Sequence, residues 1–71
     1  MMDLEFDIEL NGSAYQVMFG HTIDDLIGVL ALREKNIAVA VNRHIIPRSQ
    51  WSGLLLQRED KVDIVRAIGG G

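Results

Sequence analysis

The C-terminal end of the sequence holds the residues whose types and spacing best suggest chemistry. The run Arg66-Ala67-Ile68 gives way to three glycines, Gly69, Gly70 and Gly71, which are the last of 71 residues. Glycine loses more backbone freedom on ordering than any other residue, so we expect these glycines to form a mobile arm. An arm without side chains can carry its terminal carboxylate through a narrow channel into the active site of another protein. The alternative is an inert tail, because chain ends made of small residues often fray.

The other residues that could support catalysis form no known arrangement. No serine lies in a nucleophile-elbow pattern, and no acid–histidine spacing supports a catalytic triad or a metal site. Asp24 and Asp25 are neighbours on a predicted helix, where they point in different directions and favour the positive end of the helix dipole. We therefore predict that the chain has no catalytic residue of its own and no metal ligand. The serines and histidines considered are Ser13, Ser49, Ser52, His21 and His44.

The length and composition favour a binding or carrier role over an enzyme. A domain of 71 residues buries only about 60% of the surface of its unfolded chain, so a deep catalytic cleft is not expected. The sequence has no cysteine, which is compatible with a reducing cytosol. Any sulfur chemistry must therefore use sulfur that comes from elsewhere.

Charge and hydropathy argue against two classes of partner. The net charge is −3 and the basic residues are scattered, whereas nucleic-acid binding needs a basic patch. Residues 1–5 carry acids where a signal peptide carries basic residues, and no apolar run is long enough to span a membrane. We expect a cytoplasmic protein that binds neither nucleic acid nor membranes.

Alternating apolar residues predict a hairpin at the start of the chain. Every second residue from Leu4 to Leu10 is apolar and the residues between are acidic, which is typical of a strand with one buried face. Asn11-Gly12 is the preferred centre of a two-residue type I′ turn. The alternation resumes at Tyr15, Val17 and Phe19, so we predict a returning antiparallel strand. The acidic, solvated face consists of Asp3, Glu5, Asp7 and Glu9.

An amphipathic helix is predicted next. Thr22 is a suitable N-cap, and apolar residues at i, i+3, i+4 and i+7 form one stripe that should lie on the sheet. We expect the last turn at residues 33–35 and the end of the helix at Asn36, which tolerates the left-handed conformation. Gly28 either permits a close approach by a neighbouring element or is a tolerated imperfection. The stripe consists of Ile23, Leu26, Ile27 and Leu30.

Short elements should follow the helix. Residues 37–41 are apolar without alternation, as expected for a central strand covered on both faces. A tight turn at Asn42-Arg43 and an edge segment at residues 44–46 come next, and Pro47 should end that segment because proline cannot donate to a sheet ladder. We then expect a helical turn at residues 49–51 with Trp51 seated against the sheet. A short apolar element at residues 54–56 and a charged turn at residues 57–60 complete this region.

The final strand should lead directly into the glycines. Residues 61–64 alternate in polarity, and Val65 and Ala67 then place apolar groups on the opposite face. Because exposed apolar residues beside the tail could contact a partner, we expect docking on this face, with Arg58 and Arg66 as polar neighbours. The order of elements predicts an α+β roll, with a mixed sheet of about four or five strands and one main helix on one face.

Several of these segments together resemble a known family. They are residues 37–42, Ile-Ala-Val-Ala-Val-Asn; residues 45–48, Ile-Ile-Pro-Arg; Trp51; residues 59–65, Glu-Asp-Lys-Val-Asp-Ile-Val; and the terminal glycines. This pattern resembles the sulfur carriers of thiamine biosynthesis, the ThiS family, which have a ubiquitin-like β-grasp fold. The resemblance covers the whole chain and implies a β-grasp domain over residues 1–68 and a flexible glycine tail over residues 69–71. A third glycine and an extra Met-Met-Asp at the start depart from the minimal pattern.

The resemblance implies a carrier cycle centred on Gly71. An E1-like adenylyltransferase would use ATP to convert the Gly71 carboxylate to an acyl adenylate, and a sulfur-donor protein would then supply sulfur for a thiocarboxylate. The carrier would deliver that sulfur to thiazole synthase, with Gly69 and Gly70 reaching into each partner's active site. The chain would bind no cofactor itself and would act as a co-substrate.

Three alternatives stay open at this point. The terminal glycines also occur in the molybdopterin-synthase small subunit, although the Pro47-Arg48 and Trp51 pattern argues against that assignment. The chain could instead be a ubiquitin-like modifier that forms isopeptide bonds through Gly71. It could also be a plain β-grasp interaction domain with an inert tail.

Overall fold

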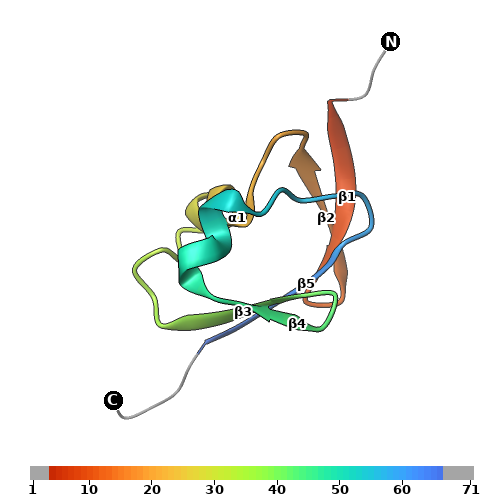
Figure 1. Cartoon of the computed structure of the whole chain (residues 1–71). Helices are drawn as coiled ribbons and strands as arrows, with labels where there is room; N and C mark the ends of the chain where they lie inside the picture. Colours follow the sequence, from red (N-terminus) through yellow and green to blue (C-terminus); the bar gives the residue numbers. More distant parts are fainter. Residues whose placement is uncertain (1–3, 67–71) are drawn as a thin grey trace.

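The computed structural model describes residues 4–66, which form a five-stranded mixed sheet with one α-helix and one 3-10 helix (Figure 1). The spatial order of the strands is β2-β1-β5-β3-β4. The predicted boundary between the domain and the glycine tail, at residues 68 and 69, lies outside the described residues. The elements are β1 (Glu5–Leu10), β2 (Ser13–Met18), α1 (Ile23–Val29), β3 (Ile37–Val41), β4 (His44–Ile46), η1 (Arg48–Gly53) and β5 (Lys61–Arg66).

The two helices cover one side of the curved sheet, as Figure 1 shows. The core between the helices and the sheet is wholly apolar in residues 4–66, with no buried polar or charged residue. Strands β1 and β5 are parallel, whereas the other neighbouring strands are antiparallel. The predicted α+β roll is therefore confirmed. The buried residues are Phe6, Ile8, Val17, Ile23, Leu26, Ile27, Val39, Val41, Trp51, Leu56 and Val62.

Both predicted tight turns are confirmed, and they share one backbone geometry. Asn11 and Gly12 have φ angles of 49° and 86°, and Asn42 and Arg43 have φ angles of 50° and 71°. Positive φ at both central residues is the signature of a type I′ turn, whose twist matches that of the strands it joins. The first turn sets a register in which Phe6 lies opposite Val17.

The buried stretch of the hairpin is shorter than the alternation of apolar residues predicts. Phe6 and Ile8 are buried, but Leu4 is 66% exposed and precedes β1. Phe19 follows β2 and is 50% exposed, with its ring 4.8 Å from that of Phe6. The expectation of burial is thus wrong for Leu4 and only half met for Phe19, because both lie beyond the paired strands at the margin of the sheet.

Helix α1 begins as predicted and ends earlier. The Thr22 hydroxyl accepts a hydrogen bond from the Asp25 N–H at 3.1 Å, and the Asp25 carboxylate accepts one from the Thr22 N–H at 2.9 Å, which together form a capping box. The helix ends at Val29, so the predicted end at Asn36 is wrong. Ala31 takes the left-handed conformation at φ 59°.

A Schellman motif explains the early end of α1. The Leu32 N–H donates to the Ile27 carbonyl and the Ala31 N–H donates to the Gly28 carbonyl, both at 3.0 Å. These bonds satisfy carbonyls that would otherwise lack partners after the last turn. The half-buried Leu32 side chain packs against the core and favours this stop over two further turns.

Strand β3 lies inside the sheet, but it is covered on one face only. Val39 and Val41 are buried, whereas Ala38 on the other face is exposed. The expectation of a strand covered on both faces is therefore wrong, because alanines occupy the outward positions and conceal the alternation. The middle strand of the sheet is β5.

The segment after β3 follows the predicted order. Strand β4 is an edge strand that ends before Pro47, and η1 buries Trp51, whose Nε1 donates to the Ile46 carbonyl at 3.0 Å. Residues 54–56 form no named strand, although Leu55 makes an isolated bridge with Thr22. The charged turn at residues 57–60 is confirmed.

Candidate functional site

Strand β5 positions the C-terminal segment because the chain passes from its last residue, Arg66, to the glycines. It pairs with β3 over five positions, from Val62 to Arg66, and with β1 over two, at Lys61 and Val62. Val62 is 1% exposed and anchors the strand in the core. Ala67, Gly69, Gly70 and Gly71, four of the predicted site residues, lie outside the described residues, so their roles stay predictions.

Two asparagines from the type I′ turns bind β5 near its two ends. At the start of the strand, Asn42 Oδ1 accepts from the Lys61 N–H at 3.0 Å and its Nδ2 donates to Asp60 Oδ1 at 3.1 Å. Towards the end, Asn11 Oδ1 accepts from the Ile64 N–H at 2.8 Å and its Nδ2 donates to the Ile64 carbonyl at 3.3 Å. The sequence analysis identified both turns but neither set of side-chain bonds.

The sheet face that points away from α1 has an apolar half beside the end of β5. Val65 is 62% exposed and lies opposite Ala38 on β3, and Ile45 on β4 is 72% exposed and lies opposite Ala40. We call these four residues the apolar outer patch. The outward placement of Val65 agrees with its predicted phase. Ile45 was missed, although two adjacent isoleucines on one strand cannot both point inward.

Arg66 and Arg58, the other two described docking candidates, lie at different ends of the sheet. Arg66 is exposed and lies opposite Ile37 at the end of β5. Arg58 precedes β5, and its guanidinium carbon lies 5.4 Å from the centre of the Phe19 ring and 5.9 Å from that of Phe6. Because side chains alternate along a strand, Arg66 points to the face opposite Val65, where it lines a hollow with Leu30 and Ile37. The structure therefore places neither arginine beside Val65 on the outer face, and Arg58 lies against the exposed aromatic margin.

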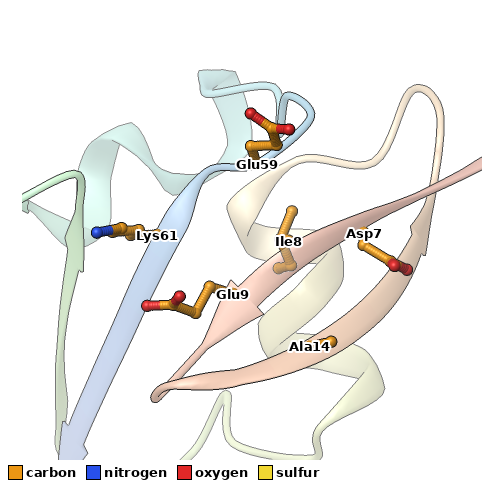
Figure 2. Close-up of a pocket in the computed structure, with 6 residues that line it drawn as sticks. All are labelled: Asp7, Ile8, Glu9, Ala14, Glu59 and Lys61. Carbon is orange, nitrogen blue, oxygen red and sulfur yellow. The ribbon is translucent and has the colours of Figure 1, made fainter.

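A hollow on the acidic half of the outer face has a volume of about 360 Å³. Its lining includes Asp7 and Glu9 from β1, Glu59 from the charged turn and Lys61 from β5 (Figure 2). The three carboxylates point in different directions in Figure 2 and share no central point. Within residues 4–66, no group of three His, Cys, Asp or Glu side chains could hold a metal ion. The hollow is thus part of the solvated acidic face that the alternation predicts.

The titratable side chains of residues 4–66 differ from those typical of acid–base catalytic sites. Desolvated titratable side chains are typical of such sites, and the core of residues 4–66 contains none. Asp25 does have a lowered pKa, because its carboxylate accepts hydrogen bonds from the backbone N–H and the hydroxyl of Thr22. These hydrogen bonds belong to the helix cap, so the lowered pKa of Asp25 has a structural cause. In the same part of the chain, no helix is long and apolar enough to cross a membrane.

Comparison with known proteins identifies the family. The model of the ThiS family matches residues 8–71. The sequence is 34% identical over 64 residues to the sulfur carrier protein ThiS of Escherichia coli strain K12, across 90% of this chain and 97% of that protein. This chain belongs to the ThiS family. The match extends through the glycines that lie outside the described structure.

Two further proteins are similar to this chain, one in its fold and one, a larger protein, in its sequence. The thiamine biosynthesis protein ThiS of Geobacter metallireducens superposes with a TM-score of 0.76 at 18% identity, over 93% of this chain and all of that one, which supports the shared fold. The thiazole synthase of Magnetococcus marinus is 31% identical over 64 residues. That match covers 90% of this chain but only 20% of the thiazole synthase.

The residues that gave the ThiS resemblance have structural roles in the described part of the chain. Arg48 donates to the carbonyls of Arg33 and Lys35 at 2.9 and 3.1 Å, and its guanidinium carbon lies 4.5 Å from the centre of the Trp51 ring. These contacts tie η1 to the loop that follows α1. Arg48 and Trp51 therefore have a packing role in this chain.

Proposed function

We propose that this chain is a sulfur carrier whose Gly71 carboxylate is adenylated and then converted to a thiocarboxylate that donates sulfur to the thiazole of thiamine. The observation that carries the proposal is the match over nearly the full length of a relative named as a sulfur carrier protein, with a family match that reaches Gly71. The absence of cysteine supports the C-terminus as the place where sulfur is held.

The chemistry requires activation because a carboxylate is a poor electrophile. In the first step, a Gly71 carboxylate oxygen attacks the α-phosphorus of ATP, and pyrophosphate leaves. In the second, hydrosulfide released by the donor attacks the acyl carbon, and AMP leaves with one of the original carboxylate oxygens. The product carries one sulfur in place of one oxygen. An E1-like adenylyltransferase supplies the active site for the first step, and ATP binds to that enzyme.

Thiazole synthase is the acceptor that we propose for the sulfur. A segment similar to this chain covers about a fifth of the Magnetococcus marinus thiazole synthase, which supports a functional connection between this chain and a thiazole synthase. In this chain, the carrier would reach a separate thiazole synthase through Gly69 and Gly70, whose lack of side chains suits a narrow entrance. The expected location is the cytoplasm.

We further propose that the adenylyltransferase docks on the apolar outer patch. The partner must contact the surface next to the point where the chain leaves β5, because its active site has to receive a carboxylate five residues beyond Arg66 (71 − 66 = 5). Val65 and Ile45 are the exposed apolar residues of that patch, and Arg66 and Ala67 adjoin it in the sequence. Arg58 would form a separate contact at the aromatic margin.

Deletion of Gly70-Gly71 tests the proposal. The truncated chain should support no ATP–pyrophosphate exchange by the adenylyltransferase, and its melting temperature should stay close to that of the full chain, since chain ends contribute little to stability. Gly70→Val should behave in the same way, because it places a branched side chain where only backbone would fit. Both variants should still bind the enzyme, and Val65→Asp should weaken that binding. Undiminished exchange by the truncated chain would contradict the carrier function.

A further inference from the structure

Asn11 is the last contact between the β1 side of the sheet and β5. Strand β1 ends at Leu10, and its ladder with β5 ends at the pair Leu10 and Val62. The Asn11 N–H then donates to the Val62 carbonyl at 2.9 Å, and the Asn11 side chain binds both backbone groups of Ile64. The side chain thus extends the ladder by one step towards the C-terminus, after the main chain of the hairpin has turned away.

The position of this contact matters because Ile64 lies close to the end of the structured strand. Arg66, the last residue of β5, is two positions further along the chain, and on this side of the strand Asn11 supplies the last bonds described within residues 4–66 that join β5 to the hairpin. Beyond Ile64, the pairing described within residues 4–66 joins the strand to β3, at Val65 and Arg66. Without Asn11, the end of β5 would be held on one side alone.

We propose that Asn11 is a positioning residue for the activation of Gly71, an inference that rests on the proposed function. Its side chain fixes the last residues of β5, so that the segment carrying Gly71 starts from a defined point. Fraying of β5 back to Ile64 would lengthen the segment that a partner enzyme has to order, and ordering each additional residue costs conformational entropy. Asn11 therefore favours productive insertion of Gly71 without contacting the reacting atoms.

Asn42 provides a matched control for this proposal. It occupies the same position as Asn11 in a type I′ turn, with φ 50° against 49°, and its Oδ1 also accepts from a β5 backbone N–H. Its bonds, however, lie at Lys61 and Asp60, at the start of the strand. Loss of the Asn42 side chain therefore removes comparable hydrogen bonds at the start of β5, and the bonds at Ile64 remain.

Glycine substitutions isolate the two side chains, because glycine accepts the positive φ of either turn and retains the backbone N–H. Asn11→Gly should lower kcat for AMP formation by about three- to tenfold, the range that the loss of one or two hydrogen bonds produces, with little change in KM. It should also speed hydrogen exchange at the Ile64 amide. Asn42→Gly should stay within about twofold of the wild-type kcat.

The assay uses the full chain with ATP, a sulfur donor and an E1-like adenylyltransferase, at a temperature where every variant is folded. Equal kcat values for Asn11→Gly and the wild type would overturn the proposal. So would an equal loss in Asn42→Gly or unchanged hydrogen exchange at the Ile64 amide. If the wild-type chain forms no AMP at all, the proposed function fails first, and the exchange rate at Ile64 still shows whether Asn11 holds β5.

Discussion

At the residue scale, Gly28 in α1 lies against the side chain of Arg33. A Cβ at Gly28 would lie 2.7 Å from the Arg33 guanidinium carbon and Nη2. The approaching group is the flexible end of a side chain and not a neighbouring element, which favours the interpretation of Gly28 as a tolerated imperfection. The Arg33 side chain is 54% exposed and pairs with Asp24 at 3.2 Å.

Gly28→Ala should therefore be neutral or stabilise the fold by up to about 1 kcal/mol. Alanine removes the entropic cost of glycine in a helix, about 1 kcal/mol, whereas an exposed ion pair such as Arg33–Asp24 contributes between about 0 and 1 kcal/mol. Urea denaturation of both proteins measures the difference in the free energy of unfolding. A loss above about 1 kcal/mol would mean that Arg33 cannot move aside and that the end of α1 is distorted.

The Thr22–Asp25 cap predicts a specific dependence of stability on pH. Hydrogen bonds from the Thr22 backbone N–H and hydroxyl lower the pKa of Asp25 below its ordinary value of 3.8. Because the folded-state pKa is the lower one, the unfolded chain binds more protons there, so the contribution is complete above pH 3.8 and is lost as the pH falls through the folded-state pKa. Asp25→Asn should be less stable than the wild type at neutral pH, and the difference should shrink at lower pH.

Thermal melts of the wild type and Asp25→Asn between neutral pH and the lowest pH at which both remain folded would test this. A difference in melting temperature that stays constant across the series would contradict the assigned role of the carboxylate. Asp24, which is not part of the capping box, supplies the comparison through Asp24→Asn. That variant removes the exposed contact with Arg33 and one charge in the first turn of the helix, and it leaves the capping box intact.

Residues that act within a few positions of one another could be predicted from the sequence. The Thr22 cap and the Asn11-Gly12 turn depend on local spacing, and both are confirmed. The bonds from Asn11 to Ile64 could not be predicted, because they join positions 53 apart and depend on the register of β5 against the hairpin. The exposure of Ile45 required knowledge of which of two adjacent isoleucines faces the core.

At the scale of elements, the type of each element was easier to predict than the residue at which it ends or the number of its faces that are buried. The apolar stripe of α1 identified the helix, but its end depends on Ala31 in the left-handed conformation, which alanine adopts less readily than glycine or asparagine. Strand β3 appeared to be covered on both faces because Ala38 and Ala40 are apolar and small. In both cases tertiary packing decided the outcome, through Leu32 against the core and through the placement of both helices on one face.

The stripe on α1 predicts a large contrast between two substitutions on the same helix. Leu26 is 1% exposed, so Leu26→Ala should cost about 2–5 kcal/mol by leaving a cavity. Val29 is 64% exposed, and Val29→Ala should change the stability by less than about 0.5 kcal/mol. Chemical denaturation of the two variants beside the wild type gives both values. A loss below about 0.5 kcal/mol for Leu26→Ala would contradict its place in the core.

At the scale of the whole molecule, the described fold and the proposed chemistry occupy different parts of the chain. Residues 4–66 form an apolar core under a sheet, with no buried polar residue and no candidate metal cluster among them. The ThiS-family match continues through Gly71, whose carboxylate we propose as the site of the chemistry. In this account, β5 and its asparagine contacts hold the start of the segment, and the apolar outer patch receives the partner.

The most direct test of the central claim is the intact mass of the chain after incubation with ATP, an E1-like adenylyltransferase and a sulfur donor. The account predicts a mass increase equal to the exchange of one oxygen for sulfur, which fragmentation should place at Gly71. The chain that lacks Gly70-Gly71 should keep its original mass under the same conditions. An unchanged mass for the full chain, a ladder of conjugates with other proteins, or sulfur located anywhere other than Gly71 would contradict the claim.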